Sequence, residues 1–296
     1  MARVNILKQI KVGDRWKLEA RALGIGREAE EVSKTPMHVA AKRYLDVVEG
    51  LKKPATHRKY KAVLDRFLEF FVDRTNVKSI TSDDLNQFMV HLKRKHKLDN
   101  NSVIHNTIIV AQFLKKQGRP GLTRGIDLPE RVQNLPVEYS DDELKRFFDA
   151  CTPEERTLFT TFLLTGFREI EVVHLAWSDI NSSLATLKVT LKPDLGFSPK
   201  RWEEREVPVP KQLIKLLSEH PRKPPCRFVF PSPAGNREYH MLDRCKAVAK
   251  RAKLDEEKFN LKTFRSTYAT RMLRAGFDVR TVQHWMGHKS LETTMR

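Results

Sequence analysis

Apolar side chains recur every three or four residues through residues 34–117, which is the spacing of amphipathic α-helices. Four such stripes follow one another, and each gives its helix one apolar face. The stripes consist of Val39, Tyr44, Leu45 and Val48; Tyr60, Val63, Leu64, Phe67, Leu68 and Phe71; Leu85, Phe88, Met89 and Leu92; and Val103, Ile108, Ile109, Phe113 and Leu114. We expect Thr56 to cap the start of the second helix, and the fourth helix to start at Asn101 or Ser102. The pattern predicts a compact bundle of four helices.

The pattern weakens on both sides of this bundle. Residues 1–33 alternate only loosely between apolar and polar positions, so we expect an N-terminal extension with a β-hairpin as its simplest fold. Residues 118–137 carry glycines and prolines but no apolar period, which is typical of an interdomain linker. We therefore expect a second domain over residues 138–296.

The second domain is expected to combine helices with a few strands. Ser140 and Glu143 have the spacing of a capping box ahead of an apolar helical stripe, and a further buried helix should end at Gly166. Residues 184–191 alternate as a strand, and residues 206–210 read as its antiparallel return. The sequence thus predicts a mainly α protein with a small β-sheet in its second domain.

The segment after Gly166 predicts one more helix with a charged face. Ile170, Val173 and Trp177 are spaced to face the core. Arg168 and Glu171 then lie together on another face, as residues three positions apart do on a helix. Such a pair is ordinarily a surface ion pair.

The end of the chain predicts two helices, separated at Gly276 and followed by a turn at Gly287 and His288. Lys262 and Arg265 are three positions apart and therefore share one face of the first helix. Two cations and an imidazole carried by a turn suit an anionic tetrahedral group such as a phosphate.

Charge supports that interpretation. The 296 residues include 55 Lys and Arg against 37 Asp and Glu, a net charge of +18 with a pI near 9.9. The excess is larger in residues 1–135 than in residues 136–296. Because each neutralised phosphate releases counterions, such a balance favours a nucleic acid as partner, contacted most strongly by the first half of the chain.

Cysteine usage and the missing motifs exclude several other classes. Cys151, Cys226 and Cys245 are far apart and lack a Cys-x-x-Cys spacing, which disfavours a disulfide framework or a zinc site and indicates a reducing compartment. We find no Walker loop, no His-Glu-x-x-His and no acidic cluster for a two-metal nuclease, so no metal or cofactor is expected. Without a signal-peptide core or a long apolar run, we expect a cytoplasmic, nucleoid-associated protein that is not bound to a membrane.

Three blocks of the second domain together resemble the signature of the tyrosine recombinases, the phage-integrase family. Residues 165–171 read Thr-Gly-Phe-Arg-Glu-Ile-Glu and are followed by a Leu-x-Trp-x-Asp-Ile block. Residues 262–265 read Lys-Thr-Phe-Arg where the family has His-x-x-Arg, and residues 286–290 read Met-Gly-His-Lys-Ser where it has Leu-Gly-His-x-Ser. The order of the helices in the first domain is also similar, so the resemblance covers roughly residues 38–296.

The resemblance implies a two-domain, C-shaped clamp around double-stranded DNA, made of a SAM-like helical core-binding domain and an α+β catalytic domain. The full-length protein would form a homotetramer on DNA, and this chain alone would be a monomer. Residues of the first domain expected to contact DNA are Lys52, Lys53, Arg58, Lys59, Lys93, Lys95, Asn101, Ser102 and Asn106.

The resemblance also implies catalytic roles. Arg168 and Arg265 would hold the scissile phosphate, because the planar guanidinium fork grips two oxygens. Glu171 would orient Arg168, and His288 would bond the phosphate or assist the proton traffic of the nucleophile. Lys262 occupies a slot that commonly holds His, so we expect it to coordinate phosphate rather than act as a base.

The family carries its general acid, a lysine, on the β-hairpin, commonly eight residues before a proline. Lys200 has this spacing from Pro208, while Lys192 and Arg201 are the competing candidates. The lysine would protonate the leaving 5′-oxygen of the DNA.

The family's nucleophile is a tyrosine nine residues after the turn histidine, which forms a 3′-phosphotyrosyl intermediate. Counted from His288, it is expected at position 297, one past the last residue of the sequence. Tyr268 lies at a core-like position and does not match that slot. We therefore predict a site-specific recombinase or integrase, with this 296-residue chain inactive in cleavage. The alternatives are a non-catalytic DNA-binding protein of the same fold and a type IB topoisomerase-like enzyme.

Overall fold

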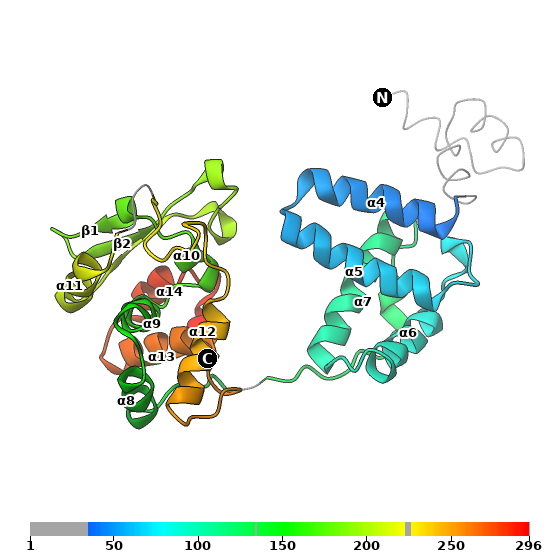
Figure 1. The fold of residues 1–296 in the computed structure, drawn as a ribbon. Helices are drawn as coiled ribbons and strands as arrows, with labels where there is room; N and C mark the ends of the chain where they lie inside the picture. The colour runs from blue at the N-terminus through cyan, green and yellow to red at the C-terminus, as the bar shows by residue number, and fades with distance from the viewer. Residues whose placement is uncertain (1–34, 134, 223–225, 296) are drawn as a thin grey trace, which may run out of the picture. The chain divides into compact units, whose positions relative to one another are not determined.

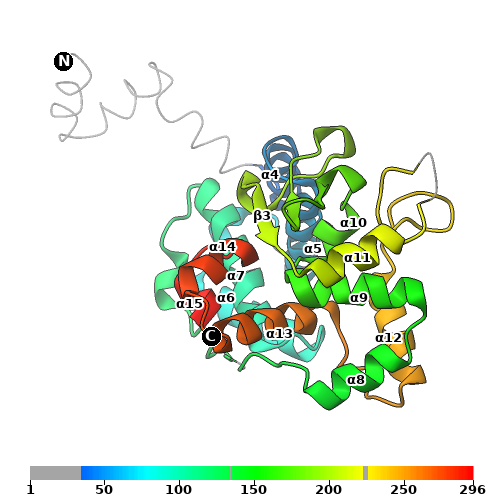
Figure 2. The ribbon, with the colours of Figure 1, turned by 90° about the vertical axis from the view of Figure 1, so that its left-hand side faces the viewer.

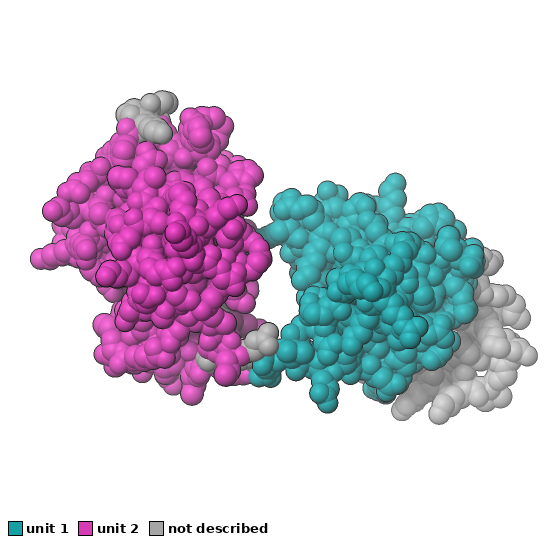
Figure 3. All heavy atoms as spheres, turned by 60° about the horizontal axis from the view of Figure 1, so that its bottom comes forward, with its two compact units in different colours: residues 1–133 teal, residues 134–296 magenta. Residues whose placement is uncertain are grey.

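The computed structural model of the chain describes residues 35–133, 135–222 and 226–295. The chain separates into two compact units, residues 1–133 and 134–296 (Figure 3). Each unit has its own hydrophobic core. The hairpin predicted in residues 1–33 lies outside the described residues.

Unit 1 is a helical bundle, as the four apolar stripes predict (Figure 1). Its helices are α4 (Met37–Leu51), α5 (Pro54–Phe70), α6 (Ser82–Arg94) and α7 (Asn100–Lys116), with the short 3₁₀ helices η1 (Val77–Ser79) and η2 (Leu122–Gly125). Phe67 lies at the centre and packs edge to face with Phe88 and Phe113.

Two helix starts differ from the sequence prediction. Helix α5 begins at Pro54 rather than after Thr56, since proline is well suited to the first helical position. Helix α7 begins at Asn100 rather than at Asn101 or Ser102. The Asp99 side chain caps it by accepting a hydrogen bond from the Ser102 backbone N–H (3.0 Å).

The segment predicted as a linker is mostly bonded to unit 1. Arg119 donates a hydrogen bond to the Ile80 carbonyl (2.7 Å), and the Asn100 and Asn101 side chains donate to the carbonyls of Glu130 and Val132 (2.9 and 2.8 Å). The two units therefore divide at residues 133 and 134, inside the predicted linker 118–137.

Unit 2 combines helices with one small antiparallel sheet. Its α-helices are α8 (Asp141–Asp149), α9 (Pro153–Thr165), α10 (Glu169–Val173), α11 (Lys211–Glu219), α12 (Met241–Arg251), α13 (Leu261–Arg274), α14 (Val279–Met286) and α15 (Leu291–Met295). Short 3₁₀ helices are η3 (Trp177–Asp179), η4 (Pro193–Leu195) and η5 (Lys200–Trp202). Ser140 caps α8 through the predicted capping box with Glu143. The prediction of a mainly α protein with a small sheet is confirmed.

The sheet has the order β1-β2-β3, with β1 (Ile180–Asn181), β2 (Thr186–Val189) and β3 (Arg205–Pro208). Leu187 pairs with Val207, and Val189 with Arg205, so these side chains point to the buried face of the sheet. Helices α9 and α13 lie side by side beneath the sheet, and α14 lies next to β3 (Figure 2). This packing brings the predicted catalytic blocks together. Among the described residues no helix is both long and apolar enough to cross a membrane.

For the helix after Gly166, the prediction of which side chains face the core was wrong. Ile170 is 44% exposed, whereas Glu171 is buried with Val173. Helix α10 has only five residues, too short for an apolar stripe to determine its orientation. A buried carboxylate at this position requires cationic partners.

Candidate active site

The site is built around the carboxyl end of α14. Gly287 ends this helix with φ +59°, a left-handed conformation that favours glycine. The backbone N–H of Gly287 donates to the His284 carbonyl (2.9 Å), and that of His288 donates to the Gln283 carbonyl (3.1 Å). This pair of bonds is the Schellman arrangement, and it turns the chain sharply so that His288 leaves the helix axis.

Three arginines bind the three carbonyls that this turn leaves without helical partners. Arg205 Nε donates to Trp285 (2.7 Å), Arg265 Nη2 donates to Met286, and Arg168 Nη2 donates to Gly287 (2.8 Å). The carboxyl end of a helix carries partial negative charge, so it attracts cations. The turn thus gathers guanidinium groups from α10, α13 and β3 at one place.

Glu171 joins two of these arginines. Its carboxylate accepts hydrogen bonds from Arg205 at 2.6 and 3.0 Å, and from Arg168 Nη1 at 2.8 Å. Burial raises the pKa of Glu171, but the hydrogen bonds and charge of Arg205, together with Arg168, outweigh it and hold the pKa below its ordinary value. Glu171 is therefore an ionised, buried link that fixes Arg168.

Arg205 was missed by the sequence analysis. Its side chain is 4% exposed and stacks 5.4 Å above the Phe167 ring. The available signal was strand alternation, because Arg205 shares the inward face of β3 with Val207. A buried arginine on a core strand requires an anionic partner, which is Glu171 here.

Arg265 is buried in the second turn of α13 and also donates to the Gly166 carbonyl. Burial and the nearby Arg168 guanidinium lower the pKa of Arg265 to about 9, so the group remains a cation at neutral pH. Both of these acceptors, the carbonyls of Gly166 and Met286, are neutral. An anion close to Arg265 would stabilise its charge.

His288 is half-buried beside these cations. Its Nδ1 lies 3.0 Å from the Thr294 hydroxyl. Burial, followed by the charges of Arg265, Arg168, Arg205 and Lys200, lowers the pKa of His288 to about 4. The imidazole is therefore neutral at pH 7, because burial and the nearby cations both disfavour its protonated form.

The candidate lysines of the hairpin lie in different environments. Lys200 is exposed and lines a cavity of about 170 Å³ with Arg168, Arg205 and Gly287. Lys192 is 6% exposed, and its Nζ lies 2.9 Å from the Asp179 carboxylate. Of these two lysines, Lys200 is the one next to the arginine cluster. The side chain of Arg201, the third candidate, lies outside the described part of the structure.

Lys262 and Arg265 meet in a second, larger cavity. It has a volume of about 690 Å³ and is also lined by His288 and Thr294. Lys262 is exposed and Arg265 buried, so the two predicted cations approach the cavity from its rim and its floor. The structure thus gathers Arg168, Glu171, Arg265 and His288 directly, with Lys200 and Lys262 at the edges.

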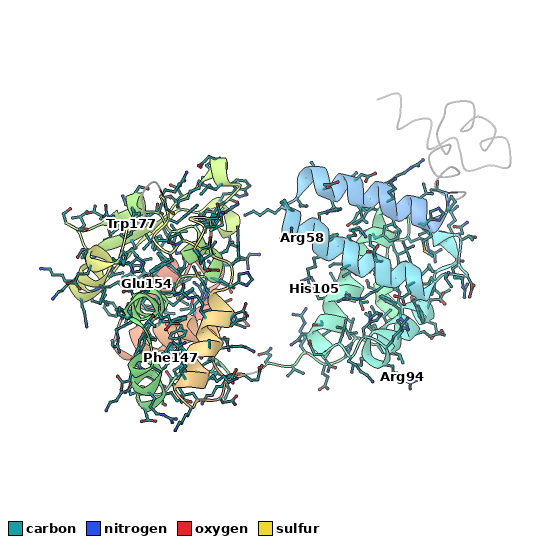
Figure 4. The ribbon with its side chains drawn as sticks, in the orientation of Figure 1. Arg58, Arg94, His105, Phe147, Glu154 and Trp177 are labelled. Carbon is teal, nitrogen blue, oxygen red and sulfur yellow. The ribbon has the colours of Figure 1, made fainter. Side chains whose placement is uncertain are left out.

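The predicted DNA-contacting residues of unit 1 differ in exposure. Lys52, Lys53, Arg58, Lys59, Lys93, Lys95 and Asn101 are exposed, Ser102 is intermediate and Asn106 is buried. Asn106 accepts a hydrogen bond from Arg66 (3.2 Å), and Lys95 pairs with Glu69. Helix α7 packs against α5. Figure 4 shows Arg58 on α5 and His105 on α7. Burial and then the charge of Lys59 lower the pKa of His105.

Tyr268, on the same helix as Arg265, is buried. Burial raises its pKa to about 12, and a Cβ on Gly166 would lie 2.5 Å from its ring. The ring therefore fills the core beneath the arginines. Among the described residues no three His, Cys, Asp or Glu side chains are grouped so that they could hold a metal ion.

The arrangement can bind an anion because its hydrogen-bond donors are already held in place. The guanidinium groups of Arg168 and Arg265 are held by backbone carbonyls and Glu171, and the neutral His288 imidazole stands beside them. Such prearranged donors stabilise negative charge as it develops on a phosphate, because they need not reorient during the reaction.

Comparison with known proteins identifies the family of the chain. Residues 139–296 match the phage integrase family. The chain is 30% identical over 224 residues to a putative integrase/recombinase, y4qK, of Sinorhizobium fredii, covering 72% of this chain and 68% of that protein. It is 26% identical over 273 residues to the tyrosine recombinase XerD of Lacticaseibacillus casei, covering 85% and 89%.

Solved structures share the fold. The Tn1549 transposon integrase in complex with a circular intermediate DNA superposes with a TM-score of 0.72 at 15% identity, covering 86% of this chain and 93% of that one. A lambda integrase tetramer bound to a Holliday junction gives a TM-score of 0.69 at 14% identity, covering 90% and 79%. The chain belongs to the phage integrase family and is a site-specific tyrosine recombinase.

Proposed function

We propose that this recombinase binds a DNA phosphodiester at the cluster formed by Arg168, Arg265 and His288, and that a tyrosine at position 297 attacks it. The reaction forms a 3′-phosphotyrosyl bond and releases a 5′-hydroxyl, and the reverse attack by a 5′-hydroxyl rejoins the strand. The P–O5′ bond breaks as the tyrosine P–O bond forms, and this new ester keeps the energy of the phosphodiester, so rejoining consumes no nucleotide.

The observation that carries this proposal is the surplus of positive charge at the α14 turn. Three guanidinium groups converge there, and Glu171 is the carboxylate that two of them, Arg168 and Arg205, share. Burial first, and then the neighbouring cations, lower the pKa of both His288 and Arg265. A bound phosphate would compensate that charge, and it would do so most strongly when extra negative charge develops in the transition state.

Lys200 is the proposed general acid. It lies beside Arg168 at the open cavity, whereas Lys192 is held in a buried ion pair with Asp179. An ammonium group near the leaving oxygen can donate the proton that the 5′-hydroxyl requires. Lys262, exposed at the rim of the larger cavity, is proposed to contact phosphate.

The 296-residue chain is proposed to bind DNA without cleaving it. Tyr268 is buried and has a raised pKa, so it cannot reach a phosphate held at the surface of the cluster. A gel assay on nicked duplexes tests this. The chain should give no covalent adduct, and the same chain continued through a tyrosine codon at position 297 should give one on the 3′ side.

Controls make the gel assay decisive. Replacing the tyrosine at position 297 by phenylalanine should abolish the adduct with DNA binding nearly unchanged, because one hydroxyl is lost. Arg265→Gln in the continued chain should lower the cleavage rate by about 10²–10³-fold. An adduct from the 296-residue chain, or one that persists after the phenylalanine substitution, would assign the nucleophile elsewhere and contradict the proposal.

The exposed basic residues around the start of α5 are proposed to hold the DNA backbone. Two of them, Lys52 and Lys53, lie in the turn between α4 and α5, and two, Arg58 and Lys59, lie in the first turns of α5. The homotetramer on DNA is proposed for the full-length protein, and a monomer for this chain. Light scattering that finds a stable tetramer of the 296-residue chain without DNA would contradict the second proposal.

A further inference from the structure

The hairpin between β2 and β3, residues 190–204, is anchored to the body of unit 2. Lys192 and Phe197 exchange two backbone hydrogen bonds of 3.0 Å each, which close a small loop around η4. Gly196 ends η4 with φ +62°. The chain then turns to Lys200, three residues after Phe197.

One anchor is an aromatic stack. Phe197 is 5% exposed, and its ring lies flat on the His174 ring, with centroids 4.3 Å apart and an interplanar angle of 14°. His174 is the C-cap of α10, the helix that Arg168 caps at the other end. The stack therefore joins the hairpin that bears Lys200 to the helix that bears Arg168.

Hydrogen bonds fix the His174 ring in one state. Arg237 Nη1 lies 3.1 Å from His174 Nε2, and a guanidinium can only donate, so Nε2 is the acceptor. Nδ1 then carries the proton and donates it to the Ile170 carbonyl (2.8 Å). Arg237 also donates to the Leu195 carbonyl in η4 (3.0 Å), so the same residue holds the histidine and the loop.

A second anchor is the ion pair of Lys192 with Asp179. Both side chains are buried, and the Asp179 carboxylate also accepts hydrogen bonds from the Thr190 hydroxyl (2.9 Å) and the Ala176 backbone N–H (2.8 Å). These bonds leave Lys192 a structural role at the base of the loop. They account for the presence of two lysines in one hairpin.

We propose that His174 and Phe197 are positioning residues, which hold the Lys200 segment at a fixed place relative to Arg168. This inference rests on the proposed role of Lys200 as general acid. Neither His174 nor Phe197 touches the reacting atoms. Their effect is geometric, since a misplacement of about 1 Å can cost about 10²-fold in rate.

The first test is amide hydrogen exchange on the 296-residue chain. In Phe197→Ala the backbone amides at positions 192 and 197 should exchange about tenfold faster or more, because the loop loses its stacked ring. Phe230→Ala is the matched control, because Phe230 is also buried and packs on a histidine ring, His220, at 5.1 Å. Equal exchange at these two amides in wild type and Phe197→Ala would overturn the proposal.

The second test separates positioning of the acid from general loss of structure. It uses the chain continued through the tyrosine codon and a duplex site selected by this protein from a random library. The bridging 5′-oxygen at the mapped cleavage position is replaced by sulfur, which leaves as a thiolate and needs no acid. Phe197→Ala should cleave the oxygen substrate about 10²-fold more slowly and the sulfur substrate at nearly the wild-type rate, with the Kd for DNA unchanged.

Two further variants complete the design. Phe197→Tyr keeps a stackable ring and should restore cleavage of the oxygen substrate. Lys200→Ala should show the same sulfur rescue as Phe197→Ala. If sulfur fails to rescue Lys200→Ala, the role of Lys200 is wrong and the exchange test alone decides the anchor. If sulfur rescues Lys200→Ala but not Phe197→Ala, the positioning role is wrong.

Discussion

Arg205 shows how one buried side chain can organise a site without being its most exposed charge. It holds both oxygens of Glu171 and the Trp285 carbonyl, and so joins β3, α10 and α14. Arg168 depends on the same carboxylate. We conclude that Arg205 supports the arginine cluster that we propose as the phosphate site.

Arg205→Met should therefore destabilise unit 2 strongly. The substitution leaves Glu171 buried with less compensation, and breaking a buried pair from one side costs about 3–5 kcal/mol. Lys61→Met is the matched control, because Lys61 and Asp65 form an exposed pair on α5, worth about 0.5 kcal/mol or less. Urea unfolding of both variants measures the difference. Equal losses of unfolding free energy would mean that the Arg205–Glu171 pair contributes no more stability than the exposed pair.

His288 makes a prediction about pH. Its folded pKa of about 4 lies below the ordinary value near 6.5, so protons bind the unfolded chain first as the pH falls. The stability contributed by the neutral ring is complete above pH 6.5 and is lost progressively toward pH 4. An NMR titration should give a midpoint near 4 for His288 in the free protein and a higher one with duplex DNA, whose phosphates add negative charge. A midpoint near 6.5 without DNA would show that the cations do not act on this ring.

The sequence allowed prediction of Arg168, Arg265 and His288 because each belongs to a local block of a few residues. The burial of Glu171 was not predictable in this way. Its decisive partner, Arg205, lies 34 residues further along the chain, and only the pairing of β2 with β3 brings it inward. Local spacing describes a helix face, whereas burial is a property of the tertiary structure.

At the scale of elements, long periodic segments were predicted best. The helices of unit 1 follow their apolar stripes, with starts displaced by about two residues, as frayed ends allow. Strand β1 was missed because the two residues Ile180 and Asn181 cannot show an alternation. The 3₁₀ turns inside the β2–β3 hairpin were missed because they are fixed by contacts with His174 and Asp179.

The junction of α9 and α10 gives a prediction about element packing. Gly166 has φ +60°, and a Cβ there would lie 2.5 Å from the Tyr268 ring and 2.8 Å from the Met286 sulfur. Gly166→Ala should cost backbone strain plus overpacking of about 1–3 kcal/mol. Gly276→Ala is the control, because Gly276 has φ +87° and open space around it, so it reports the strain alone. Equal unfolding free energies for the two variants would show that α13 can shift away from Gly166.

At the scale of the whole molecule, charge dominates the expected behaviour. The chain carries a net charge of +18, and exposed cations gather around the start of α5 in unit 1, while the arginine cluster lies in unit 2. Two units that each present cations can contact separate phosphates of one duplex. Their contributions to the salt dependence then add, because each contact releases its own counterions.

We therefore expect binding of the 296-residue chain to duplex DNA to weaken steeply with salt. If six or more phosphates are contacted, affinity should fall by roughly 10³-fold or more between 50 and 200 mM salt. Lys53→Gln and Lys59→Gln should each reduce the slope of log K against log salt by about 1. Lys215→Gln is the control, because Lys215 is also exposed but pairs with Glu219 on α11 in unit 2 and is not among the predicted contacts. Fluorescence anisotropy at several salt concentrations measures all three. A slope that is flat in the wild type, or that falls equally in Lys215→Gln, would show that unit 1 does not hold DNA through the start of α5.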